Sequence, residues 1–227
     1  RVSFTLYIFI KKDLNMKDWQ KFLESNQERF EHELLDFVSI PSVSASSEYV
    51  DDVERAARWV SNRLEKAGAE NTVIMPTGGH PVVYGDWLHA GESKPTILIY
   101  GHFDVQPAEP FDLWDTPPFK PEIRNGKVYG RGASDDKGGM LIPIISFEAI
   151  KETKGELPVN VKFLFEGQEE IGSPELPEFI AKHRRKFSCD MIFSADGLQW
   201  TEDEPNIVLG LKGLLGVEIK LTGPKVD

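Results

Sequence analysis

The stretch TILIYGHFDVQP, residues 96–107, joins an apolar run to two polar side chains that can do chemistry. Residues Ile97 to Tyr100 predict a buried strand, which Gly101 interrupts. His102 and Asp104 follow, with one residue between them. A histidine in this setting is either hydrogen-bonded within the core or part of a site at the strand's end. The stretch alone leaves both interpretations open.

Two other predicted strands end in the same way. Val161–Phe165 is followed by EGQEE, which contains Glu169 and Glu170, and Met191–Ser194 is followed by Asp196. A glycine-rich loop, GRGASDDKGG, adds two adjacent aspartates just before an expected helix. In open α/β sheets, ligand groups gather at the carboxyl ends of the strands. The polar side chains of these segments are therefore expected to converge on one edge of the sheet.

The rest of the chain alternates between helical and strand patterns. Apolar positions recur at helical spacing in four segments: 19–38, 49–66, 139–151 and 177–186. Short apolar runs predict five strands: 72–75, 82–87, 97–100, 159–165 and 191–194. Asn125-Gly126 predicts a hairpin turn, and the tail from 206 to 223 has the pattern of one or two further strands. The expected fold class is α/β, with a mixed, mostly parallel sheet flanked by helices.

Composition excludes several classes of protein. The 227 residues carry a net charge of −11, with 37 acidic against 26 basic residues, which argues against a nucleic-acid partner. No apolar stretch is long enough to cross a bilayer, so no membrane partner is expected. The single cysteine, Cys189, rules out an intramolecular disulfide and cysteine-based zinc sites, and suits a reducing cytoplasm. Neither GxxxxGK[ST] nor GxGxxG is present, so a nucleotide-binding protein is not favoured.

The chemistry of the predicted edge favours a cation site. One histidine with several carboxylates and no thiolates is typical of hydrolytic zinc, manganese or cobalt sites. Adjacent carboxylates such as Glu169 and Glu170 repel each other unless cations lie between them, and one of the pair can move protons while the other binds metal. Each feature alone has a simpler explanation: Asp135-Asp136 as a helix N-terminal cap, Glu169-Glu170 as a solvated turn. Their coincidence at strand ends favours metal.

Four segments together resemble one known family: GHFDVQP, LWDTPPFKPEIRNGKVYGRGASDDKGG, FEGQEEIGSP and SADG. They are similar to the dinuclear zinc metallopeptidases that include carnosinase-type dipeptidases, carboxypeptidase G, acetylornithine deacetylase and succinyl-diaminopimelate desuccinylase. The similarity runs from about residue 27 to the end, and the residues of these segments are most similar to the dipeptidase branch. It implies a di-zinc aminopeptidase-like catalytic domain that hydrolyses dipeptides or short peptides.

The resemblance also implies a role for each matching residue. His102 and Asp196 would bind one divalent ion, Asp135 would bridge two ions, and Glu170 would bind the second. The ions would be zinc, with manganese or cobalt as alternatives. The peptide bond after Asp135 is expected to be cis.

Two further residues receive catalytic roles from the resemblance. Glu169 would be the general base that activates water, and Asp104 would orient the ring of His102.

The chain departs from the family in one respect. Members carry a later histidine for the second ion and an inserted lid that makes the homodimer, and no histidine follows Asp196 here. We therefore expect residues 1–15 to be an upstream extension, 16–212 the N-terminal part of the catalytic domain, and 213–227 the start of a transition to a missing lid. A fragment of this kind is expected to show little activity alone.

Two other functions stay open on the sequence. The first is an amidohydrolase that removes the acyl group from N-acyl amino acids. The second is a non-catalytic binding or interaction fragment.

Overall fold

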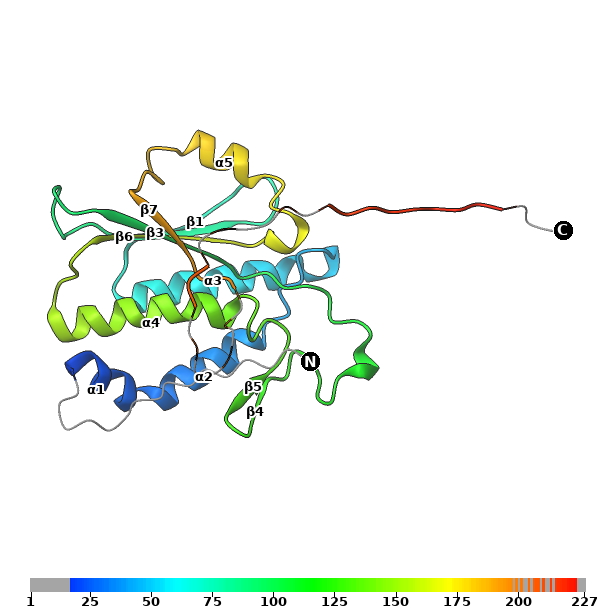
Figure 1. Ribbon diagram of the computed structural model, residues 1–227, viewed down its shortest axis with the longest axis horizontal. Helices are drawn as coiled ribbons and strands as arrows, with labels where there is room; N and C mark the ends of the chain where they lie inside the picture. Colours follow the sequence, from blue (N-terminus) through cyan, green and yellow to red (C-terminus); the bar gives the residue numbers. More distant parts are fainter. Residues whose placement is uncertain are drawn as a thin grey trace.

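The computed structural model describes residues 17–197 and, beyond them, 199, 201, 204, 206–208, 210, 213 and 215–223. A five-stranded sheet forms the middle layer of the molecule, and helices cover both of its faces (Figure 1). The predicted upstream extension, residues 1–15, lies outside the described residues. Within the described part of the chain, no helix is both long and apolar enough to cross a membrane.

The sheet has the strand order β1-β2-β6-β3-β7. Its strands are β1 (Glu70–Met75), β2 (Val82–Trp87), β3 (Thr96–His102), β6 (Asn160–Glu166) and β7 (Met191–Ser194). Strand β3 pairs in parallel with β6 and with β7, whereas β2 is antiparallel to both β1 and β6. The predicted α/β class with a mixed sheet is confirmed, and the parallel part of the sheet is the part that carries the predicted site residues.

The central strand β6 is buried along its whole length because both faces of the sheet are covered. Its residues Val161, Phe163 and Phe165 point into the larger core cluster. Leu164, on the opposite face, packs in a second cluster with Phe179. Alternating side chains of a strand reach opposite faces, so this one apolar run anchors both cores.

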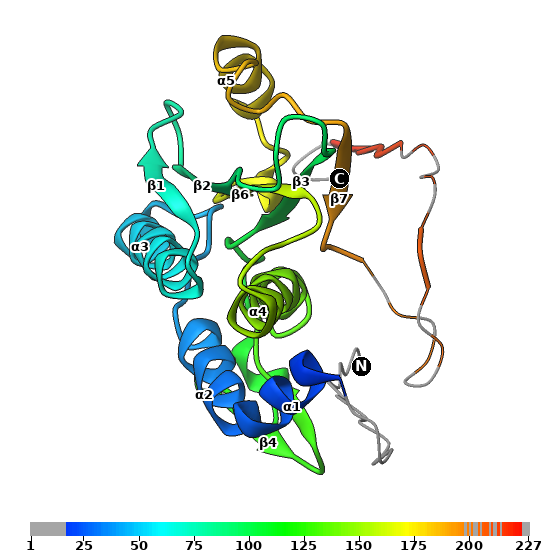
Figure 2. The same ribbon diagram turned by 90° about the vertical axis from the view of Figure 1, so that its left-hand side faces the viewer.

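The described residues form five α-helices, which lie on both sides of the sheet (Figure 2). Helices α3 (Val50–Ala67) and α4 (Lys137–Lys154) cover one face, and α5 (Leu176–Lys182) covers the other. Helices α1 (Asp18–Ser25) and α2 (Gln27–Val38) form an outer layer against α4.

Helix α3 illustrates why these segments fold as they do. Its residues Val53, Ala56, Val60 and Leu64 recur at helical spacing and are fully buried. Gly68 follows with φ of 91°, a left-handed conformation that glycine adopts without strain, and the helix ends there.

Several predictions are refined by the structure. The helix predicted over 19–38 is two helices, because the main chain leaves helical geometry at Asn26, whose side-chain Nδ2 donates to the carbonyl of Phe22 at 2.8 Å. The Asn125-Gly126 hairpin is present between β4 (Glu122–Arg124) and β5 (Lys127–Tyr129). The strands predicted in the tail are wrong for the described residues 207, 208 and 215–223, which are not assigned to any strand. A strand needs a neighbour for its backbone hydrogen bonds, and none of the described strands pairs with these residues.

Candidate metal centre

The ends of β3, β6 and β7 and the start of α4 meet at one edge of the sheet. His102 is the last residue of β3, and Glu169 and Glu170 lie in the short helix η3 (Glu169–Ile171) just after β6. Asp196 follows β7, and Asp135 lies two residues before α4. The convergence predicted from the strand ends is confirmed, because parallel neighbours deliver their carboxyl ends to the same edge.

His102 is completely buried and sits at the middle of the group. Its Nδ1 lies 3.1 Å from the main-chain oxygen of Asp104. A carbonyl can only accept, so Nδ1 carries the hydrogen and the other ring nitrogen faces the acidic side chains. From Nε2, the distances are 3.0 Å to Asp135 Oδ1, 3.7 Å to Glu169 Oε2 and 3.9 Å to Asp196 Oδ2. Three carboxylates therefore surround one ring nitrogen.

Asp104 ties the histidine to the turn that carries the two glutamates. It is fully buried, and its Oδ1 is 3.4 Å from His102 Nδ1. The two carboxylate oxygens also accept the main-chain N–H groups of Glu169 and Glu170, each at 3.1 Å. One buried side chain thus contacts the proposed metal ligand and the proposed base together.

Gln106 holds Glu170 in place, a contact that the sequence did not reveal. The main-chain N–H of Gln106 donates to Glu170 Oε1 at 3.2 Å, and its side-chain Nε2 donates to Oε2 at 2.8 Å. Donor atoms of His102, Asp135 and Glu170 all lie within 4.8 Å of one another. Only the position of Gln106, two residues after Asp104 in GHFDVQP, hinted at this contact.

Asp136 supports the metal centre through the main chain of His102. The sequence predicted Asp136 only as part of an acidic pair. It is fully buried, and its Oδ2 accepts the main-chain N–H of His102 at 3.2 Å. A Cβ at Gly101 or Gly139 would lie 2.6 Å or 2.2 Å from its carboxylate oxygens, so only glycine fits at both positions. The presence of these glycines was the available sequence signal for a supporting role of Asp136. The peptide bond between Asp135 and Asp136 is cis, as the resemblance implied.

Glu166 follows the same predicted strand but does not join the carboxylates around Nε2. It is fully buried, and its Oε1 accepts hydrogen bonds from the hydroxyls of Tyr100 at 2.6 Å and Ser173 at 2.9 Å. Because Ser173 lies just beyond Glu169 and Glu170, Glu166 fixes the far end of the loop that carries them. Glu166 therefore supports the loop of the site and is not one of the carboxylates around Nε2.

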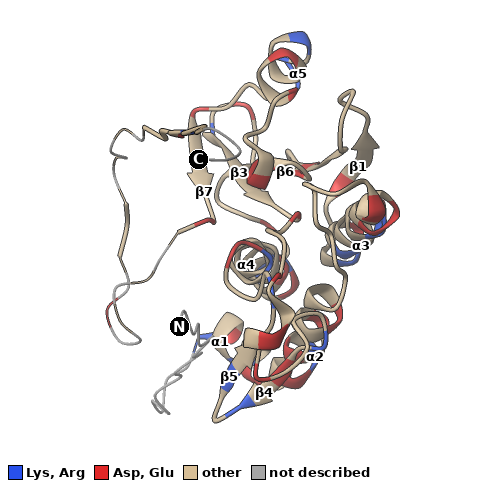
Figure 3. Cartoon of the chain, turned by 90° about the vertical axis from the view of Figure 1, so that its right-hand side faces the viewer, with Lys and Arg blue, Asp and Glu red and all other residues tan. Residues whose placement is uncertain are grey.

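Acidic positions lie just after β7, and others lie on α2 and α3 (Figure 3). Burial, reinforced by neighbouring carboxylates, raises the pKa of Glu169, Glu170 and Asp196. Burial opposes a charge on His102, but hydrogen bonds to Asp104 and Asp135 outweigh it and raise the pKa of the imidazole to about 11. Without another cation, a proton on His102 offsets part of this negative charge.

The donor set fits a divalent metal ion. Because Nδ1 carries the hydrogen, Nε2 of His102 and Asp135 Oδ1 are both acceptors, and they lie 3.0 Å apart. Two acceptors this close need a proton or a metal ion to hold them together. All the available donors are carboxylate oxygens or an imidazole nitrogen, a set that suits zinc, manganese or cobalt. The arrangement can polarise a carbonyl, activate a water and leave one carboxylate free for proton transfer.

Sequence comparison places these residues among known peptidases. The chain is 35% identical over 221 residues to the Cys-Gly metallodipeptidase dug1 of Schizosaccharomyces pombe, a match that covers 90% of this chain and 45% of the relative. It is 32% identical over 207 residues to human Beta-Ala-His dipeptidase, covering 85% of this chain and 41% of that one. The chain therefore spans less than half the length of the curated relatives it matches.

Structural comparison agrees. The solved structure of human carnosine dipeptidase 1 matches with a TM-score of 0.74 at 32% identity, over 80% of this chain and 41% of that one. Residues 98–223, which include His102, Asp135, Glu169, Glu170 and Asp196, match the profile of Peptidase family M20/M25/M40. The chain belongs to Peptidase family M20/M25/M40.

Proposed function

We propose that this chain carries the metal centre of an enzyme that hydrolyses the peptide bond of dipeptides or short peptides. The observation that carries the proposal is the set of three carboxylates within 3.9 Å of one buried imidazole nitrogen. The dipeptidases among the relatives support a small peptide as substrate.

The proposed centre holds two divalent ions, zinc in preference to manganese or cobalt. His102 and Asp196 would hold one ion, Glu170 would hold the other, and Asp135 would serve both. A bound divalent ion lowers the pKa of a water and polarises the scissile carbonyl. Gln106 fixes the direction of Glu170 through its side-chain hydrogen bond, and Asp104 contacts both His102 and the main-chain N–H of Glu170.

Glu169 is the proposed general base. Its pKa is raised by burial, which brings a carboxylate closer to the range where it accepts a proton effectively near neutral pH. Its main-chain N–H is held by Asp104, and its Oε2 lies 3.7 Å from His102 Nε2. Glu169 takes a proton from the attacking water and delivers it to the leaving amine. Asp104 is a positioning residue in this scheme.

The Glu169→Gln variant tests the proposal. Hydrolysis should fall by about 100- to 10,000-fold, whereas zinc binding stays nearly unchanged because Glu169 is not a proposed ligand. Binding is measured on this chain by calorimetry, and hydrolysis on the longest natural polypeptide that contains it. Glu178→Gln, an exposed position on α5, is the matched control. Hydrolysis by Glu169→Gln at the unmodified rate would contradict the role of Glu169.

The substrate is tested with the same preparation. Dipeptides should be hydrolysed faster than N-acyl amino acids, and the reverse order would favour the amidohydrolase alternative. If neither is hydrolysed while zinc binds, the non-catalytic alternative is favoured.

The setting of the enzyme is also part of the proposal. The lone Cys189 suits a reducing cytoplasm. The family resemblance suggests a homodimer through a lid that follows residues 213–227, with residues 16–212 as the N-terminal part of the catalytic domain. Size measurement of the longest natural polypeptide tests the dimer.

A further inference from the structure

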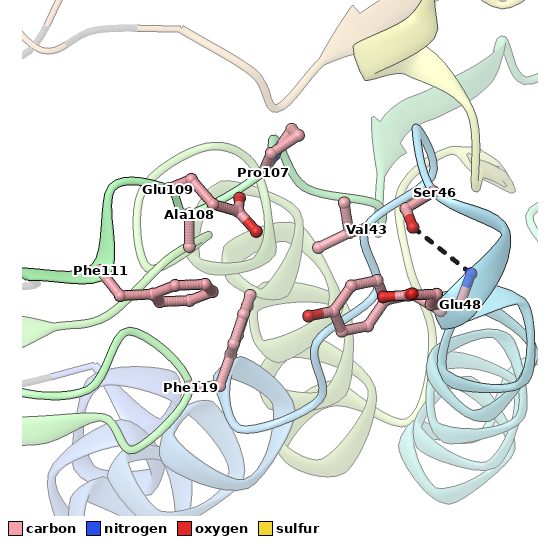
Figure 4. Close-up of a pocket in the computed structure, with 9 residues that line it drawn as sticks. Val43, Ser46, Glu48, Pro107, Ala108, Glu109, Phe111 and Phe119 are labelled. Atoms are coloured by element: carbon pink, nitrogen blue, oxygen red, sulfur yellow. Dashed lines mark hydrogen bonds between the residues drawn. The ribbon is translucent and has the colours of Figure 1, made fainter.

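A cavity lies between the short helix η1 (Ser47–Tyr49) and the loop after β3 (Figure 4). We call it the aromatic pocket; the residues that matter here are Val43, Glu48, Tyr49, Glu109, Phe111 and Phe119. Its volume is about 250 Å³. Pockets for whole small molecules are usually about 300–1,000 Å³, so this one is sized for a single side chain.

Aromatic rings form much of the pocket's wall. The rings of Phe111 and Phe119 lie next to each other on one side, and Val43 lies across from them (Figure 4). Phe111 is 49% exposed, so part of its ring is open to a ligand. Tyr49 adds a third ring to the lining. The faces of such rings attract cations.

Two carboxylates come from opposite walls of the pocket. Glu109 belongs to the loop after β3, and Glu48 belongs to η1 (Figure 4). Among the described residues, neither side chain makes an ion pair or a hydrogen bond. The pocket therefore presents negative charge and ring faces without any positive group of its own.

Elsewhere in the described part of the chain, two half-buried rings already have a cation. Arg124 lies over Tyr129 at 4.1 Å, and Arg131 lies over Trp114 at 5.3 Å. No described lysine or arginine takes the equivalent place over Phe111 or Phe119. The contrast indicates that the cation for this pocket comes from outside the described residues.

We propose that the aromatic pocket binds the guanidinium side chain of a peptide. A guanidinium is planar, stacks on aromatic faces and pairs with carboxylates, which matches the rings and the two glutamates. Its long apolar stem can lie along Val43 and the phenyl rings. A neutral side chain of the same shape would leave both carboxylates unpaired.

The loop after β3 links the pocket to the metal centre. Pro107, which also lines it, directly follows Gln106, and Gln106 donates to the carboxylate of Glu170. The same loop therefore contributes to the pocket and to the support of the metal centre. That the ligand is a peptide rests on the proposed function, whereas the recognition of a guanidinium does not.

Binding to this chain, freed of metal with a chelator, tests the proposal without any catalysis. The probes are N-acetyl-arginine amide, its uncharged analogue N-acetyl-citrulline amide, and N-acetyl-lysine amide, each titrated by amide NMR. The arginine probe should shift the amides of Glu48, Glu109 and Phe111 in a saturable way. It should bind about tenfold more tightly than citrulline and more tightly than lysine, and added salt should weaken it.

Variants locate the binding. Glu109→Gln and Glu48→Gln should each weaken the arginine probe about three- to fivefold, and the double variant more than either. Glu92→Gln, exposed in the loop between β2 and β3, is the matched control and should bind as the unmodified chain does. Equal binding of citrulline, tighter binding of lysine, or an unaffected double variant would overturn the guanidinium site. None of these results bears on the Glu169→Gln test of hydrolysis, so the two proposals fail separately.

Discussion

The carboxylate of Asp104 accepts the main-chain N–H of Glu169 at 3.1 Å, and Asp104 is fully buried. This bond joins the end of β3 to the turn after β6, and its partner bond to Glu170 N–H has the same length. A buried carboxylate that accepts main-chain N–H groups is a strong constraint, because charge-assisted hydrogen bonds are stronger than neutral ones. The positions of the proposed base and of one proposed ligand both depend on Asp104.

The Asp104→Asn variant should loosen that turn. An amide has one acceptor oxygen where the carboxylate has two, so one of the N–H groups of Glu169 and Glu170 loses its partner. We expect faster hydrogen exchange at these two amides and zinc binding weaker by about 10- to 100-fold. Hydrogen exchange and calorimetry on this chain measure the two effects.

Asp112→Asn is the control for this experiment, because Asp112 is exposed in the short helix η2 (Phe111–Leu113). It should leave both exchange and zinc binding unchanged. Slow exchange at Glu169 and Glu170 in Asp104→Asn would mean that the carboxylate does not hold the turn.

Zinc affinity should rise with pH. In the metal-free chain the pKa of His102 is raised to about 11, so the ring keeps a proton through the neutral range. Zinc needs the free electron pair of Nε2, so binding must release this proton. From about pH 6.5 to about pH 8.5, well below the raised pKa, the affinity should increase about tenfold per pH unit. Calorimetry in buffers with different protonation enthalpies should report about one proton released at His102, in addition to any from the carboxylates. A zinc affinity that does not change with pH would mean that zinc displaces no proton from His102.

Much of the site was predictable because its signals are local. The apolar runs before His102, Glu169 and Asp196 stop abruptly, and each stop places a polar group at a strand end. The rule that parallel strands present their carboxyl ends at one edge then brings the groups together. No knowledge of side-chain packing is needed for that step.

The supporting contacts were not predictable, because they join residues that lie far apart in the sequence. Gln106 reaches Glu170 across 64 residues of sequence, and Asp136 reaches the main chain of His102 across 34. Such pairs are set by how the strands stack, and the residue types alone are compatible with a solvated loop. The break at Asn26 was also hidden, since apolar positions continue at helical spacing on both sides of it.

Gly101→Ala should disturb the metal centre through Asp136. The new Cβ would lie 2.6 Å from Asp136 Oδ2 and 2.9 Å from Met140 Cβ, so the carboxylate has to move away from the His102 N–H that it now accepts. We expect a loss of about 1–3 kcal/mol in the free energy of unfolding and about tenfold weaker zinc binding. Urea denaturation and calorimetry measure these.

Gly213→Ala is the matched control for Gly101→Ala, because an added Cβ there meets no atom within 4 Å. Its stability and zinc affinity should equal those of the unmodified chain. If Gly101→Ala behaves in the same way, the close contact with Asp136 is not a constraint on the site.

Lys137→Met should destabilise the fold, because Lys137 supports the end of α2 from within the core. The side chain is fully buried, and its Nζ donates to the carbonyls of Phe37 at 3.1 Å and Ile40 at 2.6 Å. Methionine keeps the length but cannot donate, so these carbonyls lose a partner at a cost of about 1–3 kcal/mol in the free energy of unfolding. Lys182→Met, exposed on α5, should change it by less than about 0.5 kcal/mol.

The loss caused by Lys137→Met should depend on pH in a definite direction. Burial lowers the pKa of Lys137 to about 7 from 10.5. Between these values the unfolded chain binds one more proton than the folded chain, so the lysine's contribution to stability grows as pH rises. Urea denaturation with a chelator present should therefore show a larger difference between Lys137→Met and the unmodified chain at about pH 9 than at about pH 6, widening by at most about 1.4 kcal/mol per pH unit. A difference that shrinks with rising pH would mean that the buried amine stays charged in the folded chain.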